Sequence, residues 1–140
     1  MSAFVVDVSV AMKWMLPEPL ATEAARLQSP SHQLHAPSFF EIELANVLWK
    51  KVRQTLVTRA QADVFLSQLP SLPLARHADA ALVVDAFDIA DRTGRTVYDC
   101  MYLALAVRLS AKMVTADERF VNSLTGTPWA AFVIRLQDIP

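Results

Sequence analysis

The sequence predicts an α/β fold in which a parallel sheet is covered by helices on both faces. The first observation is the run from Ala3 to Val8, which is short, β-branched and almost continuously apolar, as in a strand buried on both faces. The second is the alternation of such runs with longer amphipathic segments. The third is size, because 140 residues, 54% of them hydrophobic, can bury one core without a disulfide or structural metal. We therefore expect residues 1–140 to form a single domain.

Composition excludes several classes of protein. The charged fraction of 19% and the net charge of −1 exclude intrinsic disorder and remove the usual electrostatic argument for nucleic-acid binding. The only glycines, Gly94 and Gly126, cannot form a glycine-rich phosphate loop, and Cys100 alone cannot form an internal disulfide or a cysteine-based zinc site. Asp7 and Lys13 interrupt the apolar N-terminus, so we expect no membrane segment and a cytoplasmic protein.

Caps, prolines and apolar spacing predict the elements of the first half. Ser9 is expected to cap a short helix, which Pro17 and Pro19 end. Ser38 is expected to cap a long amphipathic helix whose apolar face includes Ile42. The expected elements are a strand at 3–8, helices at 10–16 and 20–27, a strand at 34–36, and helices from 39 to about 52 and from 58 to 69.

The second half continues the alternation of strands and helices. A helix at 79–93 is expected to bury a face that includes Leu82, Val83, Ala86 and Phe87, with Gly94 as its C-cap. The other expected elements are an extended stretch at 72–74, a helix at about 98–109, a strand at 112–115, a short helix at 119–124 and a last strand at 132–134.

Four carboxylates lie in or directly beside the most apolar stretches of the chain, namely Asp7, Glu43, Asp99 and Asp117. Burying an ionised carboxylate costs several kcal/mol unless it is paired or bound to a cation. The nearby cations Lys13 and Arg95 cannot neutralise four acids. Each acid alone also has a simpler interpretation, as a helix cap, a first-turn acid or an exposed helical position. The joint pattern favours a functional cluster.

The predicted sheet brings these acids to one place. Ligands of open parallel sheets bind beyond the carboxyl ends of the strands, where Asp7 and Asp117 fall. Two carboxylates about 4 Å apart repel by roughly 4 kcal/mol at an effective dielectric of about 20, so four of them require a divalent cation. Hard oxygen ligands in this number suit Mg²⁺ or Mn²⁺.

Four blocks of sequence resemble the PIN-domain ribonucleases of the VapC toxin type. They are VVDVSVAMKW at 5–14, Pro37 with ELANVL at 43–48, TVYDCMYLALA at 96–106 and VTADERF at 114–120. They occur in the family's order and span nearly the whole chain. The resemblance implies a three-layer α/β/α sandwich with strand order 3-2-1-4-5, and Mg²⁺- or Mn²⁺-dependent cleavage of single-stranded RNA. It also implies a small cognate antitoxin of the VapB kind and a homodimer.

The resemblance also implies roles for individual residues. Asp7, Glu43, Asp99 and Asp117 match the family's catalytic acids, and Asp7, Asp99 and Asp117 would hold the metal. Ser9, Asn46 and Thr115 match supporting polar positions around them. For the homodimer, the high apolar content favours helices of the N-terminal half, with Trp14 and Trp49 as candidate contacts.

Two other functions remain open at this point. One is a receiver-type phosphoacceptor domain with Asp7 near a Mg²⁺ site, although the chain shows neither a regular strand–helix alternation nor an acceptor Asp after a middle strand. The other is a non-catalytic PIN-fold interaction module that binds a partner through its apolar surface. The complete set of four acids argues against the second alternative.

Overall fold

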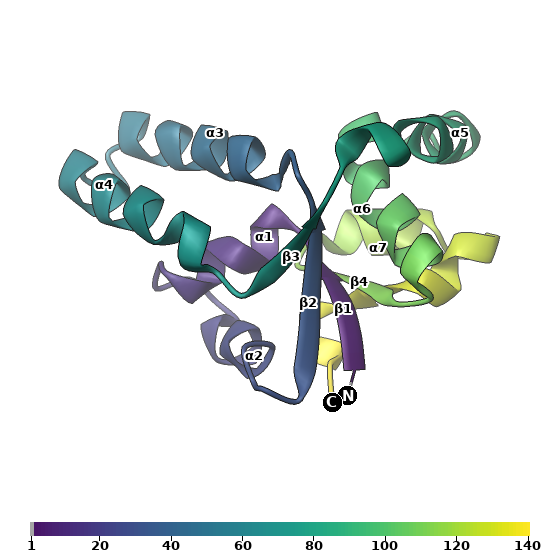
Figure 1. Ribbon diagram of the computed structural model, residues 1–140, viewed down its shortest axis with the longest axis horizontal. Coiled ribbons are helices and arrows are strands. Elements are labelled where there is room, and N and C mark those ends of the chain that lie inside the picture. The colour runs from purple at the N-terminus through teal and green to yellow at the C-terminus, as the bar shows by residue number, and fades with distance from the viewer. Residues whose placement is uncertain (1) are drawn as a thin grey trace.

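Five parallel strands form the centre of the molecule, in the order β3-β2-β1-β4-β5 (Figure 1). The computed structural model describes residues 2–140. In register, Val5 of the central strand is aligned with His35 on one side and Met113 on the other. The strands are β1 (Ser2–Val6), β2 (His32–Pro37), β3 (Leu74–His77), β4 (Lys112–Thr115) and β5 (Val133–Arg135). The predicted parallel sheet and its strand order are confirmed.

Helices cover both faces of this sheet. In Figure 1, α1 to α4 lie to one side of the strands and α5 to α7 to the other, which makes three layers. The helices are α1 (Val8–Ala11), α2 (Ala21–Arg26), α3 (Phe40–Arg53), α4 (Arg59–Gln68), α5 (Val83–Thr93), α6 (Val97–Leu109) and α7 (Glu118–Ser123). Short 3-10 turns add η1 (Met12–Trp14), η2 (Leu69–Ser71), η3 (Asp79–Ala81), η4 (Pro128–Phe132) and η5 (Leu136–Asp138).

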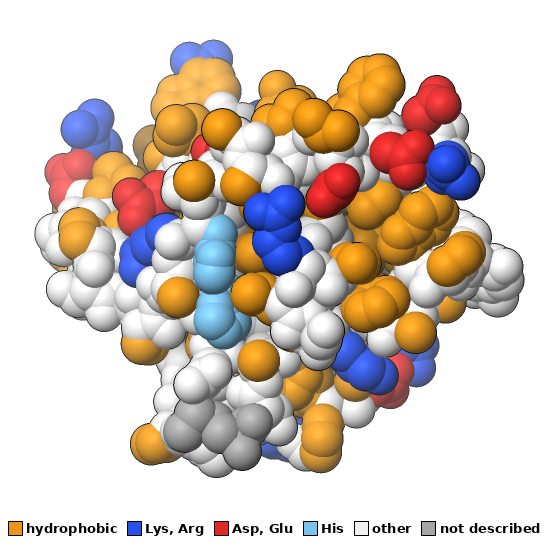
Figure 2. All heavy atoms as spheres, turned by 45° about the vertical axis from the view of Figure 1, so that its right-hand side comes forward, with side chains coloured by type: hydrophobic (Ala, Val, Ile, Leu, Met, Phe, Trp, Pro, Cys, Tyr) orange, Lys and Arg blue, Asp and Glu red, His pale blue; other side chains and the backbone are white. Residues whose placement is uncertain are grey.

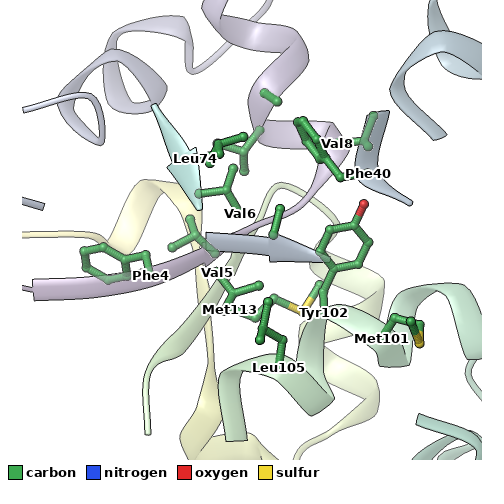
Figure 3. Packing of buried hydrophobic residues seen from close by; sticks show 14 of the residues in the cluster. Phe4, Val5, Val6, Val8, Phe40, Leu74, Met101, Tyr102, Leu105 and Met113 are labelled. Carbon is green, nitrogen blue, oxygen red and sulfur yellow. The ribbon is translucent and has the colours of Figure 1, made fainter. Parts of the chain in front are cut away.

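The helix α6 is the centre of the core. Every residue from Cys100 to Ala106 is buried, because the sheet covers one side of the helix and α5 packs on another. Figure 3 shows Leu105 and Met113 packed beneath Val5 of the central strand. A helix that is apolar all round is buried all round. The start of α6, where Asp99 lies, is therefore held rigidly against the sheet.

Two caps predicted for the first half are wrong. Asp7, and not Ser9, caps α1, because its side chain accepts a hydrogen bond from the backbone N–H of Val10. The residue before α3 is Phe39, which makes no side-chain cap, whereas Ser38 donates its hydroxyl to the carbonyl of His77. The polar side chains beside these helix ends are thus occupied in longer-range contacts.

The apolar faces of two helices also differ from the prediction. Ile42 of α3 is 75% exposed, and in α5 both Val83 and Phe87 face outward. The face that α5 buries is made by Ala86 and Ile89, together with Leu82 just before the helix. Leu82, Ala86 and Ile89 are four and three residues apart, so the apolar stripe that the helix buries is narrower than expected. The remaining apolar side chains lie at the surface.

Element boundaries account for the remaining differences. The third strand lies at Leu74–His77, later than the extended stretch expected at 72–74, and the helix expected at 79–93 is divided into η3 and α5. Gly94 ends α5 with a positive φ of 73°, as expected of a left-handed C-cap. Within the described residues, no helix is both long and apolar enough to cross a bilayer.

Candidate active site

A crevice of about 470 Å³ opens where β1 and β4 end, and all four predicted acids line it. Asp7 directly follows β1, and Asp117 lies two residues beyond β4. Glu43 and Asp99 stand in the first turns of α3 and α6. The structure thus brings together side chains that are up to 110 positions apart in the sequence. Of the predicted supporting residues, Ser9 and Asn46 line the same crevice, and Thr115 lies beneath it.

Asp7 is fixed by hydrogen bonds to both of its carboxylate oxygens. Its Oδ1 accepts from the Ser9 hydroxyl at 2.6 Å and from the backbone N–H of Val10 at 3.2 Å. Its Oδ2 accepts from the hydroxyl of Thr115, a buried residue, at 2.6 Å. A carboxylate that accepts from several donors loses its rotational freedom. Asp7 is therefore held in one orientation.

The two hydroxyl groups also tie Asp7 to the segment that carries Asp117. The backbone N–H of Ala116 donates to Ser9 Oγ at 3.0 Å, and that of Asp117 donates to Thr115 Oγ1 at 3.0 Å. A hydroxyl that accepts from an N–H keeps one proton of its own to donate, and here both donate it to Asp7. The network therefore suits an ionised Asp7.

Glu43 is held by a residue that the sequence analysis missed. The buried Tyr102 donates its hydroxyl to Glu43 Oε1 at 2.7 Å. In Figure 3 the Tyr102 oxygen points away from Leu105 and toward the start of α3. The signal was its spacing: Tyr102 lies three residues after Asp99, and residues so spaced share a helix face. The neighbouring acid Glu41 instead pairs with Arg76 at 2.9 Å, so the two glutamates have different roles.

The other two aspartates are placed by helix starts. The backbone N–H of Asp99 donates to Thr96, which caps α6, so Asp99 stands in the first turn of a 13-residue helix. Negative charge is favoured there by the helix dipole. Asp117 is itself the N-cap of α7, since its Oδ1 accepts from the backbone N–H of Phe120 at 3.1 Å. Asp117 therefore both caps α7 and belongs to the acid cluster, two roles that the sequence analysis treated as alternatives.

Burial and, to a smaller extent, mutual repulsion raise the proton affinity of Asp7, Glu43 and Asp99. Burial raises the pKa of Asp7 to about 6; its hydrogen bonds oppose this rise, and the charge of Asp99 adds to it. Burial also raises the pKa of Glu43, with smaller contributions from the charges of Asp7 and Asp99. For Asp99, burial is again the main cause of a raised pKa and the charge of Asp117 adds to it, while Arg95 opposes it. The cluster therefore holds more negative charge than its surroundings compensate.

The donor set fits a hard divalent cation in its chemistry. Several carboxylate oxygens that repel one another, one of them fixed in orientation, are what Mg²⁺ or Mn²⁺ requires. In residues 2–140, however, no three Asp, Glu, His or Cys side chains lie close enough to form a complete ion site. Asp7 is rigid while Asp117 is exposed. Binding an ion would thus require the exposed side chains to close toward Asp7.

The opposite end of the same crevice is basic. Lys13 of η1 and Lys50 and Lys51 of α3 line it, together with Glu18. Glu18 pairs with Lys13 and with Lys51. The crevice therefore runs from a cluster of acids to a cluster of lysines, and α3 contributes to both ends.

Comparison with known proteins identifies the family. The PIN domain family matches residues 4–122, which include all four acids. The chain belongs to the PIN-domain family. Ribonuclease VapC3 of Pyrobaculum aerophilum is 35% identical to this PIN domain over 120 residues, which cover 84% of the chain and 92% of the relative.

Solved structures share the fold of this PIN domain at low sequence identity. A crystal structure of a Pyrobaculum aerophilum protein has a TM-score of 0.65 at 21% identity, and the match covers 97% of this chain and 85% of that one. A toxin–antitoxin complex from Klebsiella pneumoniae has a TM-score of 0.59 at 13% identity, with 99% and 100% covered. These similarities show that the sandwich persists when most of the sequence has changed.

Proposed function

We propose that this PIN domain is a metal-dependent endoribonuclease that cleaves single-stranded RNA and acts as the toxin of a toxin–antitoxin pair. The observation that carries the proposal is the convergence of Asp7, Glu43, Asp99 and Asp117 on one crevice, with Asp7 held by two hydroxyl groups. The curated relative named a ribonuclease covers most of the chain and supports the same activity. Hydrolysis of RNA by such a toxin would take place in the cytoplasm.

Three of the acids would bind the metal, and neighbouring polar side chains would support them. Asp7, Asp99 and Asp117 would hold one or two Mg²⁺ or Mn²⁺ ions, which supply Lewis-acid activation of water and neutralise charge at the phosphate. Ser9 and Thr115 keep the oxygens of Asp7 in place, and Asn46 adds a polar group to the crevice wall. Fixing the orientation of one ligand in this way would favour binding of the metal by the other acids.

Glu43 is suited to accept a proton. Tyr102 occupies Oε1, and no hydrogen bond from the described residues engages Oε2. Burial raises the pKa of Glu43, which improves it as a base. Water would attack the phosphorus and lose a proton to Glu43, the P–O3′ bond would break, and the leaving 3′-oxygen would take up a proton from solvent. The products would carry a 5′-phosphate and a 3′-hydroxyl, because water attacks in place of the ribose 2′-hydroxyl.

Cleavage of a mixed RNA pool tests the activity. Wild-type protein should cleave with Mn²⁺ and stop when EDTA is added, and the new 5′ ends should be phosphorylated. Asp7→Asn protein, purified in the same way, excludes a contaminating nuclease. Wild-type protein that leaves the RNA intact with Mn²⁺ would favour the non-catalytic interaction module. The receiver-type alternative conflicts with the fold, because the strand order of receiver domains is 2-1-3-4-5 and the sheet here is 3-2-1-4-5.

A small antitoxin is the proposed partner, supported by the structural neighbour described as a toxin–antitoxin complex. Co-expression of this chain with any short reading frame that adjoins its gene tests the pair. The two proteins should purify together, and RNA cleavage should fall as the partner is added. Independent purification, with cleavage unaffected by the partner, would contradict the assignment as a toxin.

A homodimer remains part of the proposal, with a revised surface. The Trp14 indole donates to the carbonyl of Ala24 at 2.8 Å and packs against the core, so it is a poor contact, whereas Trp49 is 57% exposed. Val84 and Phe87 of α5 are also exposed, and Figure 2 shows hydrophobic side chains along the upper edge of the molecule. Light scattering at micromolar concentrations should give a molar mass of two chains for the wild type. Phe87→Ser should lower the measured mass to that of a single chain.

A further inference from the structure

The lysine end of the crevice is an ion-pair network around one carboxylate. Glu18 Oε1 lies 3.5 Å from Lys13 Nζ, and Glu18 Oε2 lies 3.1 Å from Lys51 Nζ. The lysine side chains are only 12% and 23% exposed. Ammonium groups with so little solvent need an anion nearby, and Glu18 provides it.

The chain holds Glu18 firmly in this position. It lies between Pro17 and Pro19, in the turn that joins η1 to α2. Proline fixes its own φ and restricts the residue before it, so the Glu18 backbone has few alternatives. The carboxylate thus bridges η1 to α3 from a stiff turn and is not a mobile surface charge.

The lysine end lies at a fixed distance from the acids. Glu43 and Lys50 are seven residues apart on α3, which is about two turns or ~10.5 Å. Both face the crevice, as do Asn46 and Val47 between them. No carboxylate of residues 2–140 pairs with Lys50. A nucleic-acid strand whose reacting phosphate lies at the acids would therefore bring a neighbouring phosphate to the lysines.

We propose that Lys13 and Lys51 bind a flanking phosphodiester of the RNA strand, and that Glu18 occupies the place of that phosphate in the free protein. This inference rests on the proposed function, because it assigns the second half of the same crevice to the same substrate. Carboxylate and phosphate oxygens compete for the same two ammonium groups. The substrate must displace Glu18, so Glu18 weakens RNA binding while it keeps the lysines in place.

Substitution of Glu18 separates this role from a purely structural one. Glu18→Gln keeps the size of the side chain, removes the competing charge and frees both lysines. Affinity for single-stranded RNA should rise about threefold to tenfold. The slope of log affinity against log salt should stay at its wild-type value, because the lysines neutralise the same phosphate in both proteins. Inorganic phosphate should raise the melting temperature of Glu18→Gln more than that of the wild type.

Glu23→Gln is the matched control. The Glu23 side chain has the same 23% exposure and also forms an ion pair, with Arg26 at 3.9 Å, but it does not line the crevice. Its RNA affinity and salt slope should equal those of the wild type. Both variants are measured by anisotropy of a labelled oligouridylate and by thermal melting, with EDTA present throughout so that no binding measurement depends on cleavage.

The outcomes are distinct. Unchanged affinity in a folded Glu18→Gln protein would show that the ion pairs only brace the turn, and would overturn the proposal. If that variant does not fold, Lys51→Gln replaces it. Lys51→Gln should weaken RNA binding and flatten the slope of log affinity against log salt by about 0.7. The control Lys112→Gln, on the exposed start of β4, should not show this loss. Loss equal to that of Lys112→Gln would also overturn the proposal.

The same experiment separates this proposal from the nuclease itself. If the wild type cleaves RNA with Mn²⁺ but Glu18→Gln leaves the affinity for RNA unchanged, the nuclease stands and the phosphate site is lost. If the wild type never cleaves, but its affinity for RNA rises on Glu18→Gln, the phosphate site stands and the nuclease is lost.

Discussion

The two ends of the crevice handle buried charge in opposite ways. At the lysine end, Glu18 lies between Lys13 and Lys51, so the charge of this carboxylate is compensated. At the acidic end, Asp7 is held by hydroxyl and amide donors, which fix its position without cancelling its charge. Burial raises the pKa of Asp7 and of Asp99, and their hydrogen bonds only partly oppose it. An arrangement that leaves its charge uncompensated supports the proposed binding of a divalent cation.

Removing one acid should produce the largest effect. Asp7→Asn keeps the shape but provides a weaker ligand for a hard dication. RNA cleavage should fall by at least about a hundredfold, beyond the typical loss for groups that only orient a ligand. Because repulsion within the cluster falls, the metal-free protein should melt at the same temperature or higher.

The control is Asp91→Asn, on the exposed side of α5. Cleavage of labelled RNA and melting curves with EDTA and with Mn²⁺ are measured for both variants. If Asp7→Asn retained wild-type cleavage and the same stabilisation by Mn²⁺, Asp7 would be only a cap of α1, and the contrast between the two ends would disappear.

Removing a support of Asp7 should have a smaller effect. Thr115→Val keeps the shape of a buried side chain but removes the donor to Asp7 Oδ2 and the acceptor of the Asp117 N–H. Losses of about 10- to 100-fold in metal affinity or activity are typical for such groups. When the cleavage rate is measured at increasing Mn²⁺ concentrations, Thr115→Val should need more Mn²⁺ than the wild type to reach half of its maximal rate.

Thr127→Val is the matched variant, since the Thr127 hydroxyl donates only to the nearby carbonyl of Leu124. It should leave the Mn²⁺ requirement unchanged. Equal behaviour of the two threonine variants would mean that Asp7 keeps its orientation without Thr115.

Loss of the Tyr102 hydroxyl should change the pH profile more than the rate. Its hydrogen bond opposes the rise in the pKa of Glu43, so Tyr102→Phe should raise that pKa further. The acid limb of the pH–rate profile should move up by about one unit, as expected when a charged group loses one hydrogen bond. Tyr98→Phe, at an exposed position, should leave the profile in place. An unshifted limb for Tyr102→Phe would exclude Glu43 as the base.

Tyr102 also shows what the sequence could and could not predict. The acids were predictable because charge inside apolar segments is conspicuous and parallel strand ends meet at one edge. Tyr102 was not, because a tyrosine in an apolar helix is usually a core residue, and only the fold brings Glu43 at the start of α3 to its hydroxyl. Glu18 was missed for a related reason: its partners lie five and 33 positions away in the sequence, and no local pattern joins them.

The same distinction explains the errors in the fold. The long helices followed from apolar spacing, whereas the strand order was implied only by the resemblance to a known family. The exposed side chains of Ile42, Val83 and Phe87 were expected inside, because a helical pattern gives the direction of a face but not its width. Ser9 was taken as a cap because Asp7 was assigned to the strand, and an error of two residues at the end of the strand moved the cap by two residues.

The smallest expected effect is on how the free energy of unfolding depends on pH in the absence of metal. The pKa of Asp7 is about 6 in the folded protein and 3.8 without the fold's influence. Between these values the folded state holds a proton that the unfolded state has lost, so stability should rise as pH falls from about 6 toward 4. At about 1.4 kcal/mol per pKa unit, and reduced for the partial exposure of Asp7 to the crevice, the gain in the free energy of unfolding should be about 1–2 kcal/mol.

Burial and His77 lower the pKa of His35, so the contribution of this histidine to stability has the opposite sign and is lost as pH drops below 6.5. The difference between wild type and Asp7→Asn removes the histidine contribution, and denaturant unfolding in EDTA across this range measures it. A flat difference would mean that Asp7 is as well compensated as Glu18, and that the acidic end of the crevice carries no excess charge for a cation to neutralise.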